Sequence, residues 1–465
     1  MASASEPGSE TSAASPMSMG RLFGFGIGDF GFNLYWQGVS IYLLFYYTDV
    51  LELAPSTAGL IYAIASLWDG ITDPLMGILA ERTRSRWGRY RPYLLFGAVP
   101  LAVSYALIFY KPEVGAFWLA AYALTTHLLF RTLYTIANIP YSSLTARMTE
   151  DSMERNRMAA ARTVAGTLGG MTVAFFTFPL VTGIGGGDQA LGFMATAALA
   201  GGLATILILT CFASTDEPPA AAGAPQAASV LEFWRSLLKN TPFVLVVASI
   251  LLIASSITMF GKVLLYFFKY NLGDEASSRL ALTALAGMGV VMIPLWAVVT
   301  HYTSKRTVWL AGSTIAAAAL LAFYLDPPQT VEGTLIMTVV IALGFTCFPL
   351  TFWSMLPDTV EYGQWRTGIR SESLIFGLVS FSQKAALALG AFVLGLLLEA
   401  VGFVANTKPS QDTLDGLIAI MTLIPAGGIV ATMVLIAFYP LNAKRHREIV
   451  EAIADAGPPD AGPLG

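Results

Sequence analysis

Long apolar stretches, separated by short polar connections, run through most of this chain of 465 residues. A helix of about 20 apolar residues crosses the hydrocarbon core of a bilayer. Stretches of that length recur in two groups of six, and a polar segment rich in proline and alanine, 214–241, separates the groups. The pattern predicts twelve transmembrane helices, near residues 22–48, 55–79, 93–110, 115–137, 162–182, 190–212, 243–268, 278–300, 308–325, 334–354, 374–398 and 415–439.

The predicted fold is an all-α integral membrane protein with two six-helix bundles, 21–213 and 242–440, joined by the linker 214–241. Residues 1–20 are rich in Ser, Ala and Glu and lack the basic start and apolar core of a signal peptide. They are therefore expected to form a disordered tail. A second tail, 441–465, follows the last predicted helix, and its end has the same character.

Composition supports a membrane protein and removes several alternatives. Hydrophobic residues make up 55% of the chain and charged residues 12%, whereas a soluble domain carries roughly 25% charged residues. The net charge of −4 gives no basic footprint for nucleic acid. Two cysteines in apolar runs and three widely separated histidines suggest neither a disulfide framework nor a metal cluster. The sequence contains no recognisable nucleophile–base pair or phosphate loop, so neither an enzyme nor a bound cofactor is expected.

Arginine and lysine are concentrated in alternate connections between the predicted helices. Connections 80–92, 138–162 and 301–307 are basic, and so is the C-terminal tail, whereas the opposite connections carry mainly acids. Cytoplasmic loops of membrane proteins carry such an excess of positive charge. Both termini and the linker are therefore expected in the cytoplasm, in a multi-pass protein of the plasma membrane, which is the inner membrane of a bacterium.

Two aspartates, Asp69 and Asp73, lie one helical turn apart inside an apolar stretch. Residues four apart share one helix face, at about 6 Å. Each carboxylate costs roughly 2.5–3.5 kcal/mol to insert into hydrocarbon, and the two repel each other. A cation or a proton between them would remove both penalties, so the pair is a candidate site for Na⁺, Li⁺ or H⁺. The alternative is a structural partnership with Lys384 or Arg131.

Further polar residues are expected at matched depths in the membrane. Counting from the cytoplasmic arginines at 1.5 Å per residue gives one layer about 12–14 Å deep and a second at roughly 20 Å. Carboxylates and amides bond sugar hydroxyls, and the apolar faces of sugar rings stack on Trp or Tyr. Such layers are typical of a sugar path. The shallower layer contains Asp29, Asp73 and Asn138, and the deeper layer contains Asp69, Tyr134 and Lys384.

One face of the helix predicted at 115–137 is polar, because its side chains follow helical spacing. Arg131 on this face either contacts a solute, such as a uronate carboxylate, or forms a structural ion pair. Lys384 either lies on the solute path or compensates the charge of the acids. Asp29 either contacts the solute or the coupling ion, or it forms an internal salt bridge. The face consists of Arg131, Tyr134, Thr135 and Asn138.

Charge counting also indicates a bound cation. Inside the predicted membrane region three aspartates face two cations, Arg131 and Lys384, which leaves one negative charge. Lys262 and Lys269 are excluded because they lie toward the outer end of their helix, from where a long side chain can snorkel to water. One monovalent cation would neutralise the group, and protonation of one carboxylate would do the same.

Seven short motifs lie between residues 21 and 448: Gly28–Phe30, Tyr46–Val50, Trp68–Pro74, Thr83–Pro92, Asn138–Tyr141, Asp358–Gly363 and Gln383-Lys384. Together they resemble the motifs of the glycoside–pentoside–hexuronide:cation symporters of the major facilitator superfamily, the melibiose permease-like family. Each motif alone is weak, but the set is specific. The resemblance implies the major facilitator fold and uptake of a sugar or glycoside coupled to Na⁺, Li⁺ or H⁺.

The resemblance also implies which residues act. By analogy the sugar site contains Asp29, Tyr134, Asn138 and Arg162, with Lys384 nearby, and the cation site contains Asp69, Asp73, Thr72 and Thr135. In melibiose permease an acid stands where this chain has Asn138, and an asparagine stands where it has Thr72. The particular sugar and the choice of ion are therefore left open.

The predicted function is a cation-coupled symporter that imports a sugar or glycoside by alternating access, with the two bundles rocking about a midplane site. A Na⁺-coupled lysolipid transporter of the same superfamily is the alternative. Such a substrate needs a continuous apolar track and a clamp for its headgroup. The expected partners are a small-molecule sugar, a monovalent cation and membrane lipid, with no nucleic acid, and the chain is expected to function as a monomer.

Overall fold

The computed structural model describes residues 18–149, 152–217, 240–367, 372–441 and 443–455, and all regular elements in these ranges are helical. Most of the linker and both chain ends therefore lie outside the described residues. The helices of the first half are α1 (Met19–Phe45), α2 (Pro55–Arg82), α3 (Arg91–Ile108), α4 (Ala116–Met148), α5 (Ser152–Gly185) and α6 (Gln189–Ser214). Those of the second half are α8 (Thr241–Tyr266), α9 (Ser278–Tyr302), α10 (Lys305–Leu325), α11 (Val331–Phe345), α12 (Cys347–Thr367), α13 (Glu372–Ala400), α14 (Gln411–Ala437) and α15 (Ala443–Asp455).

Each predicted span coincides with a helical segment. Short π-helical turns, Tyr46–Val50 and Phe267–Asn271, extend α1 and α8, and one predicted span covers both α11 and α12. Nine helical stretches of the described chain are long and apolar enough to cross a membrane. Helices α1, α2 and α4 are outside this group, and they carry four of the charged residues of the candidate site: Asp29, Asp69, Asp73 and Arg131. The all-α membrane fold is confirmed, whereas the number of twelve spans stays a prediction.

Some helices extend well beyond the spans that the sequence pattern predicts. Helix α4 continues through Pro140 to Met148, although its predicted span ends at residue 137. A proline inside a membrane helix is tolerated where neighbouring helices and side chains satisfy the freed carbonyl group. Helix α5 begins at Ser152, which places Arg162 well inside a helix rather than at its start.

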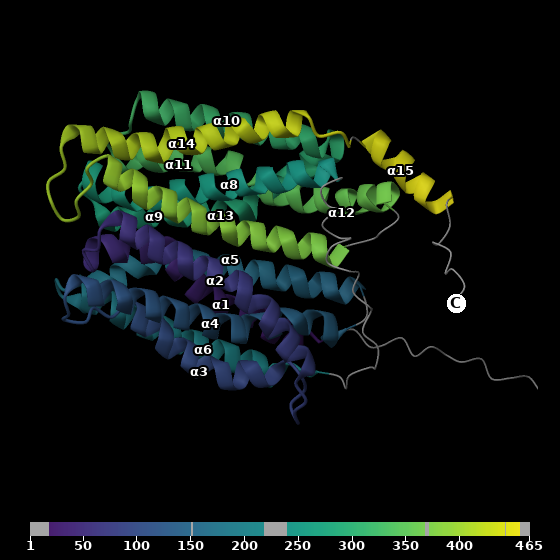
Figure 1. Cartoon of the computed structure of the whole chain (residues 1–465), viewed down its shortest axis with the longest axis horizontal. Coiled ribbons are helices and arrows are strands. Elements are labelled where there is room, and N and C mark those ends of the chain that lie inside the picture. The colour runs from purple at the N-terminus through teal and green to yellow at the C-terminus, as the bar shows by residue number, and fades with distance from the viewer. Residues whose placement is uncertain (1–17, 150–151, 218–239, 368–371, 442, 456–465) are drawn as a thin grey trace, which may run out of the picture.

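The helices form two groups that follow chain order, with α1 to α6 below α8 to α14 in Figure 1. In the first group α1 packs on α5 and α6, and α3 packs on α4 and α6. In the second group α14 packs on α8 and α10, and α8 also packs on α13. The groups meet where α2 contacts α13 and where α5 contacts α9. Residues of α1, α2, α5, α8, α9 and α13 therefore surround the space between the halves.

A polar cluster joins the halves at the end where α2 begins. Asp49, which is 3% exposed, accepts hydrogen bonds from Lys269 Nζ at 2.7 Å and Tyr270 Oη at 2.5 Å. Asn406 donates its side-chain amide to the Asp49 carbonyl oxygen at 2.8 Å. These four residues, hereafter the Asp49 cluster, connect the first half to two segments of the second half.

Charged contacts at the opposite end include two that lie within the second half. Lys305 donates to Asp358 at 2.8 Å, and His446 of α15 contacts Glu361 of α12. Helix α15 packs on α12 (Figure 1). The hydropathy pattern predicts only a tail for residues 441–465, so this helix adds to the expected architecture.

Candidate functional site

A buried ion pair connects α2 and α4. Arg131 Nη1 donates to Asp69 Oδ2 at 3.0 Å, and both side chains are 2% exposed. The same guanidinium donates to Ser66 Oγ at 3.1 Å and to His127 Nε2 at 3.2 Å. Of the two interpretations left open by the sequence, the arrangement in this structure is the structural ion pair.

The second acid of the pair is held by groups from both halves. Thr135 of α4 donates its hydroxyl to Asp73 Oδ1 at 2.7 Å. Lys384 of α13 forms an ion pair with Asp73 and lies 3.6 Å from Asp69 Oδ2. The Thr72 hydroxyl, in contrast, donates to the Trp68 carbonyl oxygen of its own helix. Three of the four residues predicted for the cation site therefore lie together.

One oxygen of this acidic pair has no hydrogen-bond partner in the described part of the chain. Asp69 Oδ1 is buried and accepts no hydrogen bond from the described residues. Carboxylate and hydroxyl oxygens are the ligands that hard cations prefer, so the free oxygen and its neighbours on Asp73 and Thr135 fit a monovalent cation or a proton. The described residues contain no cluster of three or more His, Cys, Asp or Glu that could hold a metal ion. A cation here would rely on two carboxylates and a hydroxyl.

The third aspartate is paired with an arginine that the charge count omitted. Asp29 Oδ1 accepts hydrogen bonds from Arg162 Nε at 3.1 Å and Nη2 at 3.0 Å. Asn33 donates to Asp29 Oδ2 at 3.2 Å. The Arg162 guanidinium lies 4.8 Å from the centroid of the Tyr141 ring. Because α5 starts earlier than predicted, Arg162 belongs to the interior, and the excess negative charge predicted there is not present.

Aromatic rings extend this group along α1 and α4. The ring of Tyr134 lies 5.8 Å from those of both Trp36 and Phe32, measured between centroids. Asn138 follows one turn later on α4 and is partly exposed. Of the residues predicted to bind sugar, the structure brings Asp29 and Arg162 into direct contact and places Lys384 with the acids of α2 instead.

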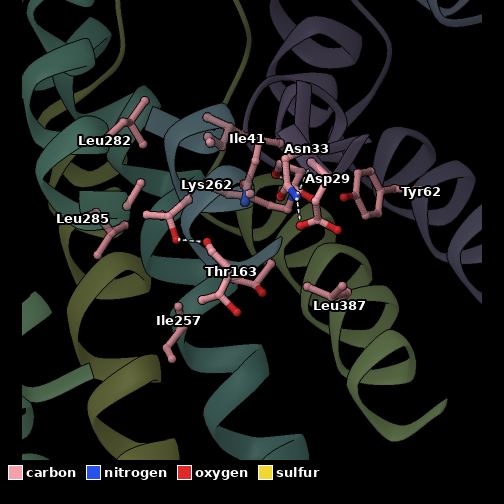
Figure 2. Close-up of a pocket in the computed structure, with 18 residues that line it drawn as sticks. Asp29, Asn33, Ile41, Tyr62, Thr163, Ile257, Lys262, Leu282, Leu285 and Leu387 are labelled. Carbon is pink, nitrogen blue, oxygen red and sulfur yellow. Dashed lines mark hydrogen bonds between the residues drawn. The ribbon is translucent and has the colours of Figure 1, made fainter. Parts of the chain in front are cut away.

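A cavity of about 470 Å³ lies between the halves and is lined by α1, α2, α5, α8, α9 and α13. Figure 2 shows its lining, which includes Asp29 and Asn33 from the first half and Lys262 from the second. Leu282 and Leu285 of α9 make part of the lining apolar. The cavity thus offers hydrogen-bonding groups and apolar surface together, as a sugar site requires.

Sequence reasoning missed Lys262, which it assigned to snorkelling. The side chain is 3% exposed, because α1 and α2 cover it: Nζ donates to the Ser40 carbonyl oxygen at 2.5 Å and lies 4.2 Å from the Tyr62 ring centroid. His127 was also missed, because a single histidine in an apolar run carries no pattern.

Comparison with known proteins identifies sugar transporters and symporters as relatives of this chain. The family model described as MFS/sugar transport protein matches residues 24–443. The uncharacterized symporter YnaJ of Bacillus subtilis (strain 168) is 31% identical over 441 residues, 94% of this chain and 95% of that protein. The isoprimeverose transporter of Lactiplantibacillus pentosus is 30% identical over 429 residues, 90% and 88% of the two chains.

A solved structure supports the fold alone. The inward-facing, unoccupied structure of a bacterial homolog of the human lysosomal transporter Spinster aligns with a TM-score of 0.65 and 13% identity. The alignment covers 94% of this chain and 98% of that one.

A helical membrane fold with two halves, a central cavity and buried charges at the interface defines a secondary transporter. The chain belongs to the MFS/sugar transport protein family. The predicted class, a major facilitator sugar symporter and not an enzyme, is thereby confirmed. The alternative of a lysolipid transporter is not favoured by these relatives.

Proposed function

We propose that this protein imports a sugar or glycoside together with a monovalent cation, and that Asp69 and Asp73 bind the cation. The observation that carries the proposal is the position of the Lys384 ammonium, which comes from the second half and contacts both acids of the first half. A coupling cation and Lys384 neutralise the same carboxylates, so they compete. Cation binding then releases Lys384 and loosens one contact between the halves.

We assign the sugar site to Asp29, Arg162, Tyr134 and Asn138, which lie on α1, α4 and α5. Asp29 lines the central cavity, and its Oδ2 has Asn33 as a neutral partner. A carboxylate can accept hydrogen bonds from sugar hydroxyls, while the Tyr134 ring offers an apolar face. Arg131, in this proposal, holds Asp69 in place instead of contacting the sugar.

The direction of transport follows from the basic connections. If the arginine-rich end is cytoplasmic, the Asp49 cluster closes the opposite side and the structure corresponds to a state that faces inward. Alternating access then requires that the Asp49 cluster open during each cycle. A single chain contains both halves and all proposed site residues, so a monomer in the inner membrane, with both termini cytoplasmic, suffices.

The coupling ion is Na⁺, Li⁺ or H⁺. The carboxylates of Asp69 and Asp73 and the Thr135 hydroxyl supply oxygen ligands for a metal cation, and the free Asp69 Oδ1 is also a position for a proton. Thr72 is the weakest member of the proposed set, because its hydroxyl is engaged with Trp68.

Transport in proteoliposomes tests the proposal. Accumulation and counterflow of a sugar panel would be measured in Na⁺, Li⁺ and choline at several pH values, for the wild type and for Asp73→Asn. We expect the variant to lose cation-driven accumulation and to retain sugar binding. Asp412→Asn, which changes an exposed acid at the start of α14, is the control. Full accumulation by Asp73→Asn would refute the assignment.

A further inference from the structure

A buried ammonium lines the central cavity without a carboxylate partner among the described residues. Lys262 of α8 and Asp29 of α1 both belong to the lining shown in Figure 2. The partners of Lys262 Nζ in the described chain are the Ser40 carbonyl oxygen, at 2.5 Å, and the Tyr62 side chain, whose ring centroid lies 4.2 Å away and whose hydroxyl is within hydrogen-bonding reach. Both partners are formally neutral.

These contacts do not compensate the charge of Lys262. An ammonium has three N–H donors, and the Ser40 carbonyl oxygen and the Tyr62 hydroxyl, both neutral, can take two of them. Charged groups buried in a membrane protein are normally paired, or they belong to the path of a substrate or ion. Lys262 therefore either binds a negatively charged ligand or is a structural residue whose burial costs an unusually large amount of free energy.

The acids nearby are already engaged by other cations. Asp29 is paired with Arg162, Asp69 with Arg131, and Asp73 with Lys384. With Lys262 included, three carboxylates face four cations, and the group carries one positive charge in excess. This is opposite in sign to the excess that the sequence predicts, and the uncompensated charge is the one that lines the cavity.

We propose that Lys262 recognises an acid group on the transported sugar, so that the solute is an acidic sugar such as a uronide. The inference rests on the proposed sugar import and adds the class of sugar. The remaining lining suits the rest of such a molecule: Asn33 and Gln37 can bond ring hydroxyls, and Leu282 and Leu285 can contact apolar faces. A carboxylate bound to Lys262 would form a charge-assisted hydrogen bond with an ammonium that is itself only 3% exposed.

Matched ligands provide the test. The purified full-length protein would be given p-nitrophenyl glucuronide and galacturonide, their methyl esters, and the corresponding neutral glycosides. Binding is followed by thermal stabilisation in detergent, and transport by counterflow in proteoliposomes. We expect the wild type to prefer at least one acid over its methyl ester by about tenfold or more, since the ester keeps the shape but removes the charge.

Variants then assign the preference to Lys262. We expect Lys262→Met to abolish the preference for the acid while neutral glycosides still bind, and Lys262→Arg to retain it. Lys111→Met is the matched control, because Lys111 also donates to a backbone carbonyl oxygen, that of Val50 at 2.7 Å, but lies outside this cavity. If Lys262 has only a structural role, Lys262→Met should instead weaken the binding of acidic and neutral ligands equally.

The outcomes separate this inference from the proposed function. Cation-driven transport of neutral glycosides without any preference for acids overturns the inference and leaves the symport intact. Acid-selective binding that depends on Lys262 but not on any cation supports the inference and removes the proposed coupling. Equal binding of acids and esters by the wild type overturns the inference even where Lys262→Met fails to fold.

Discussion

The guanidinium of Arg131 lies 3.0 Å from the Asp69 carboxylate, and both side chains are buried. The two residues are 62 positions apart in the sequence and join α4 to α2. Removing one partner of such a pair leaves an uncompensated buried charge, which costs about 3–5 kcal/mol, whereas replacing both can be nearly neutral. The pair is therefore expected to matter for the stability of the first half.

Substitution of the pair tests this expectation. Arg131→Met should lower the thermal unfolding midpoint clearly, and the double variant Arg131→Met/Asp69→Asn should recover a large part of the loss, as a double-mutant cycle measures. Arg21→Met, which removes an exposed pair with Asp216, should have little effect because surface pairs contribute about 0–1 kcal/mol. Equal loss in the single and double variants would show that charge compensation is not the cause.

Lys384→Met tests the competition between lysine and coupling cation. Without the ammonium, Asp69 and Asp73 repel each other and bind a cation more strongly. We expect the apparent affinity for Na⁺ or Li⁺ to rise by about tenfold, or 1.4 kcal/mol, as measured by cation-dependent thermal stabilisation. Lys305→Met, which disrupts the Lys–Asp pair with Asp358 inside the second half, should leave this affinity unchanged. Weaker cation binding in Lys384→Met would mean that the lysine supports the site instead.

Asp49→Asn tests the closure of the halves at the Asp49 cluster. The substitution removes the charge that Lys269 and Tyr270 share, so the closed arrangement should become less populated. The native cysteines are buried, and a cysteine introduced at the cavity residue Thr167 can be labelled with an impermeant thiol reagent from the outside.

Labelling should be faster in the Asp49→Asn background by about threefold or more, which corresponds to roughly 0.6 kcal/mol. Asp188→Asn is the control, since Asp188 lies at the same end but caps its own helix, α6. A labelling rate in Asp49→Asn that equals the rates in the wild-type and Asp188→Asn backgrounds would contradict a gating role for the Asp49 cluster.

Gly395→Ala tests the close approach of α2 and α13. A Cβ atom at Gly395 would collide with the Pro55 carbonyl oxygen, so the helices would have to separate. Overpacking of this kind costs about 1–3 kcal/mol, and the unfolding midpoint in detergent should fall by several degrees. Gly377→Ala on the same helix meets open space and should be neutral or slightly stabilising, because alanine favours helix more than glycine does. Equal midpoints for the two variants would argue against tight packing here.

The hydrophobic pattern predicted the helices well because it is local. Each helix in a bilayer must satisfy its own backbone hydrogen bonds and present apolar side chains to lipid. The pattern therefore marked the apolar part of each helix from α1 to α14. It failed where a helix extends beyond the apolar stretch, as α5 does toward Ser152, because hydropathy marks the membrane core and not the helix end.

The sequence alone determined the class of the protein and the set of charged residues that a membrane interior has to accommodate. Only the tertiary structure decided which charges pair. Asp29 pairs with a residue 133 positions away and Asp73 with one 311 positions away, so nothing in the local pattern distinguishes a partner from a free group. Lys262 illustrates the limit: its place in the helix suggested an exit to water, but packing against Ser40 and Tyr62 encloses it. Charge balance depends on which helices meet, and that depends on the whole fold.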